Sequence, residues 1–128
     1  MIDEVKDEIE TALRDSRGVV FHQKRLAFCL SFGIADILES YLKKKEVLKS
    51  GAKIDHRMFK KKKDNAKKSL ENKVISLEGL GKLDKILDIA YKIESKRNGL
   101  AYGSPVSENI LRSLINEFLE LKKEVEND

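Results

Sequence analysis

Apolar residues recur at three- and four-residue steps along most of the chain, which is the spacing of one face of an α-helix. The pattern predicts helices over residues 3–16, 20–48, 55–75, 82–97 and 105–125, separated by Gly18, 50–54, 77–81 and 98–104. Because the connections are short, consecutive helices should pack antiparallel. We therefore predict an all-α, up-and-down helical bundle in which four main helices follow a short N-terminal helix, with residues 1–128 forming one domain.

The predicted helix over 20–48 is the longest and would be the spine of the bundle. Its apolar face carries Leu26, Leu30, Ile34, Ile37, Leu38 and Tyr41. Gly33 lies in the middle of this helix, where a missing side chain allows a neighbouring helix to approach closely. Cys29 lies within the same pattern and is expected to be a buried, unreactive thiol.

Composition narrows the class of protein further. Helix-forming residues dominate and turn-forming residues are scarce, which argues against a sheet protein. A single cysteine permits no internal disulfide and indicates a reducing compartment. The acidic N-terminus is unlike a signal peptide and no apolar run has the length of a membrane span, so we predict a cytoplasmic protein with no membrane partner. Neither metal-ligand spacing nor a phosphate-binding glycine loop is present, and no metal or cofactor is predicted.

Positive charge is concentrated in one segment. Residues 53–73 contain nine Lys or Arg against three acidic residues, although the whole chain carries only +4. The candidate nucleic-acid-binding residues are Lys60, Lys61, Lys62, Lys63, Lys67 and Lys68. Such a stripe binds an RNA or DNA backbone with salt-dependent affinity. An acidic protein partner would fit it equally well, and lysine runs are commonly no more than a solvated face.

The segment 94–105, ESKRNGLAYGSP, interrupts the regular pattern. Gly99 and Gly103 predict a tight turn there, and Ser104 followed by Pro105 reads as the cap and first residue of the next helix. The N–H groups of that helix, together with Arg97, would form an anion site. In the alternative interpretation, Arg97 caps its own helix and the nearby Tyr102 packs in the core.

The motif RNGLAYG, from Arg97 to Gly103, resembles that of the HEPN domains, in which an Arg, usually followed by Asn, precedes a His at the junction of two long helices. The long helix with LAFCLSFGIADILESYL, Leu26 to Leu42, is similar to the same family. The resemblance implies a helical bundle that forms a homodimer. It also implies RNA binding or metal-independent ribonuclease activity, as in toxin subunits that pair with a nucleotidyltransferase.

Carried over by position, Arg97 would hold the scissile phosphate and Asn98 would order the turn. Tyr102 stands where the family has its catalytic His, and Ser104 where the toxins often have a Tyr. A phenol with a pKa near 10 is only ~0.1% ionised at neutral pH, so it makes a poor base. The motif Arg97, Asn98 and Tyr102 therefore favours binding over catalysis.

The histidines of this chain lie elsewhere, at His22 and His56, where a solvated helix end is the default interpretation. Our first hypothesis is an RNA- or nucleotide-binding HEPN-like protein with ribonuclease activity weakened at Tyr102. The alternatives are a non-catalytic partner of a small nucleotidyltransferase and a helical protein-interaction module that uses the lysine-rich segment.

Overall fold

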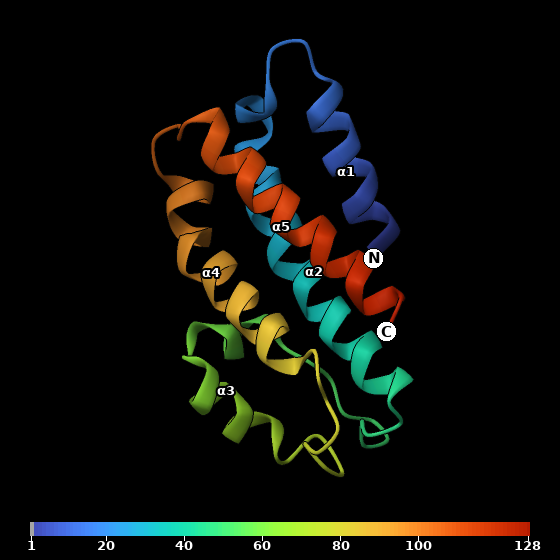
Figure 1. The fold of residues 1–128 in the computed structure, drawn as a ribbon. Coiled ribbons are helices and arrows are strands. Elements are labelled where there is room, and N and C mark those ends of the chain that lie inside the picture. Colours follow the sequence, from blue (N-terminus) through green and yellow to red (C-terminus); the bar gives the residue numbers. More distant parts are fainter. Residues whose placement is uncertain (1) are drawn as a thin grey trace.

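The computed structural model describes residues 2–128, and its regular structure is helical (Figure 1). In chain order the elements are α1 (Ile2–Arg14), the 3₁₀ helix η1 (Val19–His22), α2 (Gln23–Lys44), the 3₁₀ helix η2 (His56–Lys60), α3 (Lys63–Leu70), α4 (Leu83–Tyr102) and α5 (Glu108–Glu126). Within the described part of the chain, strand-like pairing is limited to one antiparallel bridge between Leu48 and Val74. The predicted all-α helical bundle is confirmed.

The helices α1, α2, α4 and α5 run alternately up and down, and α3 lies at one end of the bundle beside the start of α4 (Figure 1). The prediction was wrong about which helix is short, because α1 has 13 residues and α3 has eight. α1 is a full member of the bundle since Val5, Ile9 and Ala12 are buried in the common core. The segment 55–75 has too few apolar positions for one long helix and divides into η2, α3 and the bridge at Val74.

The buried apolar side chains form one continuous cluster centred on α2. Gly33 allows α2 to approach α5 closely, as predicted from its position. A Cβ atom at Gly33 would lie 2.8 Å from Cζ of Phe118 and 3.1 Å from Cγ1 of Val5, which is closer than packed carbon atoms can lie.

α2 ends earlier than the pattern predicts, at Lys44 rather than at residue 48. The backbone of Glu46 turns away with a φ of 60°, and the Val47 N–H donates to the carbonyl of Leu42. Leu48 then pairs with Val74. This pairing joins the segment after α2 to the segment after α3.

The predicted turn at Gly99 is also wrong, because α4 continues as a helix to Tyr102. Leu100 and Ala101 are buried and hold this last turn of α4 against the bundle. α5 begins at Glu108, and its N-cap is Ser107, whose hydroxyl accepts a hydrogen bond from the Ile110 N–H at 3.3 Å. The predicted helix start at Ser104 and Pro105 is therefore part of the connection.

Candidate functional site

Arg97 lies on α4 with its guanidinium over the ring of Phe28 from α2, at 4.9 Å from Cζ to the ring centroid. The side chain is partly buried, and Nε is enclosed without a hydrogen-bond acceptor. No carboxylate of the described residues forms an ion pair with Arg97, in contrast to the exposed arginines Arg17 and Arg57. Arg97 is therefore held in place by packing while its charge has no partner.

Tyr102 ends the same helix and is 72% exposed. Its ring meets the edge of Phe28, with centroids 6.2 Å apart, and Nζ of Lys24 lies 5.8 Å from the Tyr102 centroid. The interpretation that Tyr102 packs in the core is excluded. Lys24, Phe28, Arg97 and Tyr102 together form a surface of cations and aromatic rings, which we call the Arg97 face.

Asn98 does not belong to this arrangement. It is exposed on α4, and its side chain makes no hydrogen bond with the described residues. The role that the resemblance gives it, ordering a turn, is not needed because the backbone there is helical. The N-terminus of α5 is likewise occupied by the chain's own groups, since Ser107 caps it and Glu108 lies in its first turn.

The candidate lysines divide into two groups. Lys63 and Lys67 contact carboxylates of α4, at 3.8 Å from Asp88 and 2.5 Å from Asp84, and so they attach α3 to α4. The Lys67 ammonium lowers the pKa of Asp84 through its hydrogen bond.

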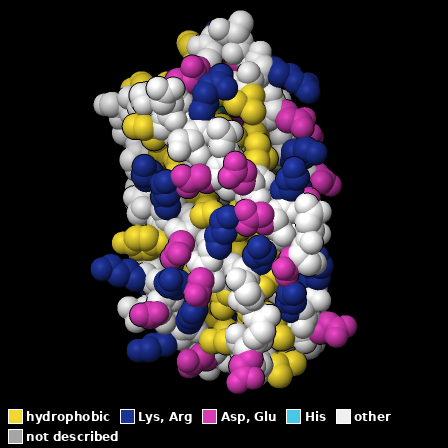
Figure 2. All heavy atoms as spheres, viewed as in Figure 1, with side chains coloured by type: hydrophobic (Ala, Val, Ile, Leu, Met, Phe, Trp, Pro, Cys, Tyr) yellow, Lys and Arg dark blue, Asp and Glu magenta, His cyan; other side chains and the backbone are white. Residues whose placement is uncertain are grey.

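Lys61 donates a hydrogen bond to Ser69 at 2.9 Å. Lys60, Lys62 and Lys68 are exposed and make no ion pair within residues 2–128. On the face in Figure 2, acidic side chains are interspersed with the basic ones. Within residues 2–128, four of the six candidate lysines therefore have no acidic partner, and one of these four, Lys61, is hydrogen-bonded to a neutral hydroxyl.

His22 is buried, not solvated as expected, and both ring nitrogens are occupied. Nε2 lies 2.8 Å from Asp15 Oδ2 and Nδ1 lies 3.2 Å from Glu8 Oε1. Asp15 also accepts hydrogen bonds from Arg17, which hold its pKa well below the ordinary value. His22 therefore joins α1 to the start of α2 and has no free nitrogen for proton transfer.

His56 is only partly buried, and within residues 2–128 only one of its ring nitrogens has a hydrogen-bond partner. Nδ1 lies 3.3 Å from Oε1 of Glu94, whose side chain is completely buried. The second oxygen of Glu94 accepts a hydrogen bond from Ser31 Oγ at 2.7 Å. The imidazole meets the edge of the Phe32 ring, with centroids 5.2 Å apart. We call His56 and Glu94 the dyad.

The sequence did contain a signal for Glu94. It falls on the apolar face of α4, one helical turn after Ala90, where an acidic residue is costly unless it is paired. Ser31 could not have been assigned to Glu94 from the sequence, because their contact depends on how α2 and α4 pack.

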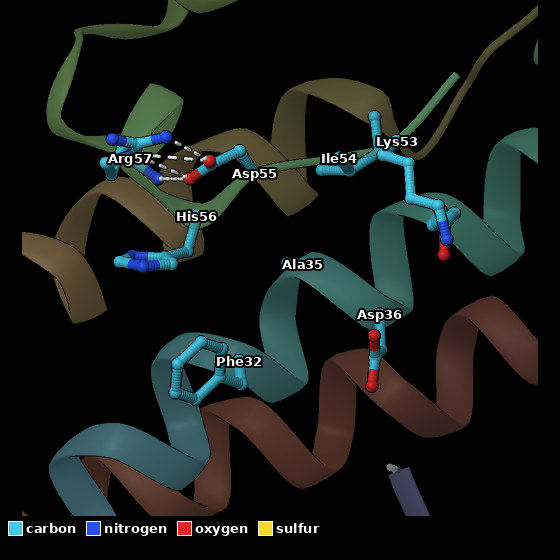
Figure 3. A pocket seen from close by; sticks show the side chains of 9 residues that line it. Phe32, Ala35, Asp36, Lys53, Ile54, Asp55, His56 and Arg57 are labelled. Atoms are coloured by element: carbon cyan, nitrogen blue, oxygen red, sulfur yellow. Dashed lines mark hydrogen bonds and ion pairs between the residues drawn. The ribbon is translucent and has the colours of Figure 1, made fainter. Parts of the chain in front are cut away.

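An open cleft of about 650 Å³ lies beside His56, between α2 and the segment that leads into η2 (Figure 3). Its lining residues are Phe32, Ala35, Asp36, Glu39, Lys53, Ile54, Asp55, His56 and Arg57. Hydrogen bonds from Arg57 lower the pKa of Asp55 to about 2. Burial, in contrast, raises the pKa of Asp36.

Within residues 2–128 no group of three or more His, Cys, Asp or Glu side chains is placed to hold a metal ion. None of the described helices is both long and apolar enough to pass through a bilayer. Cys29 is only partly buried, not fully buried as expected, and this burial raises the pKa of its thiol.

We compared the chain with models of known families, with curated proteins and with solved structures, and no significant match was found in any of the three comparisons.

Proposed function

We propose that this chain is a HEPN-like protein that binds single-stranded RNA on the Arg97 face. The observation that carries the proposal is the guanidinium of Arg97, which is fixed on Phe28 without a carboxylate partner. A guanidinium with free N–H donors is suited to a phosphate, which it can bind through two parallel hydrogen bonds.

Tyr102 supports RNA over an isolated phosphate as the ligand. Its exposed ring is held by Phe28 on one edge and by Lys24. Nucleic-acid bases stack on such rings, at about 1–3 kcal/mol per base, and single strands leave their bases free to do so. Arg97 and Tyr102 lie about 7.5 Å apart along the axis of α4, so a phosphate and a neighbouring base can be bound together.

The proposal is tested by fluorescence anisotropy with a labelled single-stranded RNA at several salt concentrations. Arg97→Gln should weaken binding about 10-fold or more. The slope of log affinity against log salt concentration should also fall by about one, the amount expected for one lost phosphate contact. Tyr102→Ala should weaken binding about 5- to 100-fold, whereas Tyr102→Phe should bind like the wild type because stacking needs only the ring.

Arg17→Gln is the matched control. Arg17 also lies over a phenylalanine, Phe21, at 4.6 Å, but it is paired with Asp15. Its removal should leave RNA affinity within about twofold. Equal losses in Arg17→Gln and Arg97→Gln would mean that only net charge matters, and the proposal would be wrong.

The homodimer and the nucleotidyltransferase partner that the resemblance implies stay predictions. Phe32 of α2 and Tyr102 of α4 are both exposed, and exposed aromatic rings are common in protein interfaces. Light scattering measures the oligomeric state directly. If the chain binds no RNA but co-purifies with a nucleotidyltransferase encoded next to it, the non-catalytic partner is the better function.

A further inference from the structure

We propose that His56 is the catalytic base of this protein, oriented by the buried carboxylate of Glu94, and that it takes the 2′-hydroxyl proton of an RNA bound on the Arg97 face. The inference deepens the proposed function and rests on it. It assigns proton transfer to a residue outside the RNGLAYG motif, where Tyr102 is a poor base.

The first support is the contact between His56 and Glu94. A carboxylate at Nδ1 favours the tautomer with its proton on that nitrogen, and leaves Nε2 free to accept a proton. Nε2 makes no hydrogen bond within residues 2–128 and is not enclosed, since the buried side-chain nitrogens and oxygens without a partner comprise only Arg97 Nε.

The second support is the cost of the arrangement. A fully buried carboxylate is unfavourable unless it is paired, and apolar groups of the same volume often stabilise a core as well or better. Ser31 donates to one oxygen of Glu94, and His56 lies at the other. Both oxygens of Glu94 are therefore held in place. A carboxylate that orients an imidazole requires this, whereas a hydrophobic core requires no carboxylate.

The third support is position relative to Arg97. Glu94 and Arg97 are separated by three residues on α4 and so lie on the same side of the helix. The aromatic rings beside them on α2 are also one helical turn apart. Arg97 lies on Phe28, and His56, the partner of Glu94, contacts Phe32. The guanidinium of Arg97 and the imidazole of His56 therefore lie against successive turns of α2.

The fourth support is the contrast with His22. That histidine also contacts carboxylates, but Glu8 and Asp15 occupy both of its nitrogens. Within residues 2–128, His56 alone of the two combines an oriented ring with a free nitrogen, and it lines an open cleft whose walls do not include Arg97. The charged groups that line this cleft with it are Asp36, Glu39, Lys53, Asp55 and Arg57.

The proposed step needs neither a metal ion nor any reactant other than RNA and water. The 2′-hydroxyl proton passes to Nε2 of His56 as the 2′-oxygen forms a bond to phosphorus. The bond from phosphorus to the 5′-oxygen breaks, and that oxygen takes a proton from water. The products are a 2′,3′-cyclic phosphate and a free 5′-hydroxyl, and Arg97 faces the charge that develops on the phosphate.

The test uses a DNA oligonucleotide with one ribonucleotide, in a buffer with a chelator, and measures binding and cleavage separately. His56→Gln should bind like the wild type and cleave about 10²–10⁴-fold more slowly. Glu94→Gln should cleave at least about 10-fold more slowly. The rate of the wild type should rise with pH because a general base acts in its unprotonated form, and this rise should be absent in His56→Gln.

Imidazole ¹⁵N spectra provide a readout that needs no RNA. The wild type should carry its proton on Nδ1 of His56, and Glu94→Gln should shift His56 towards the other tautomer. A wild-type spectrum with the proton on Nε2 would overturn the assignment. This measurement also decides the question if His56→Gln fails to fold.

The failures of the two proposals are distinguishable. RNA that binds through Arg97 but is not cleaved by the wild type, or is cleaved equally by His56→Gln, overturns the role of His56 and leaves RNA binding intact. RNA that does not bind at all overturns the proposed function and the role of His56 with it. Arg17→Gln should match the wild type in both assays.

Discussion

Gln23, the first residue of α2, donates a hydrogen bond from Nε2 to the backbone carbonyl of Leu100 in the last turn of α4, at 3.0 Å. The same amide group donates to the Ser104 carbonyl at 3.1 Å, and its oxygen accepts from the Val106 N–H at 2.9 Å. One buried side chain thereby closes the end of α4 and positions the connection to α5.

Replacing Gln23 by Leu should destabilise the protein by about 2–4 kcal/mol, because the buried carbonyl of Leu100 and two partly buried backbone groups lose their partner. Urea denaturation measures the loss, and hydrogen exchange should show the Val106 amide opening more often. Gln23→Glu retains an acceptor for Val106 but no donor, so it should protect that amide better than Leu does. Equal exchange in both variants would contradict this role.

Gly33→Ala should destabilise the protein by about 1–3 kcal/mol, because the new Cβ would meet Phe118 at 2.8 Å and Val5 at 3.1 Å. Gly99→Ala is the matched control in a helix interior. No atom lies within 4 Å of a Cβ at Gly99, so alanine there should stabilise α4 by up to about 1 kcal/mol. Thermal unfolding of the two variants should therefore shift in opposite directions.

Asp36→Asn should raise the Tm near neutral pH, since burial raises the pKa of the Asp36 carboxyl above its ordinary 3.8. A raised pKa means that the folded state holds the proton more tightly than the unfolded state. This group therefore costs stability as the pH rises through its folded pKa. The Tm difference between variant and wild type should shrink as the pH is lowered towards 3.8, and a difference that is constant with pH would contradict the assignment.

The lysines of residues 60–68 whose side chains form no ion pair or hydrogen bond within residues 2–128 should affect RNA binding, and the two that are paired with acidic residues should affect the fold. Replacing Lys60, Lys62 and Lys68 by Gln should lower the salt dependence of RNA affinity without changing the Tm, because none of them makes an ion pair in the described chain. Replacing Lys63 and Lys67 should instead loosen α3 from α4 through the loss of Asp88 and Asp84. Unchanged RNA affinity in the triple variant would restrict binding to the Arg97 face.

The all-helical class and the apolar face of each bundle helix could be predicted from the sequence, because helical spacing of apolar residues is a local property. Val5, Leu30, Ile86 and Leu114 are all buried, as the pattern requires. The helix ends were less accurate. Gly99 was expected to break α4, but Leu100 and Ala101 gain enough burial to continue the helix to Tyr102.

The candidate site was only partly accessible to sequence reasoning. Arg97 and Tyr102 could be selected from their motif, and the structure brings both to Phe28. The dyad could not be selected, since His56 and Glu94 are 38 residues apart and meet only because η2 packs on α4.

Residue spacing by itself therefore determined that this chain is a helical bundle and which side chains enter its core, since helix formation and amphipathic burial depend on neighbours within two turns. Tertiary structure alone decided which polar groups meet. It paired Lys67 with Asp84, enclosed both nitrogens of His22, and left His56 with one free nitrogen beside a cleft. Such contacts join residues that are remote in sequence, and no local pattern encodes the angle and depth at which two helices pack.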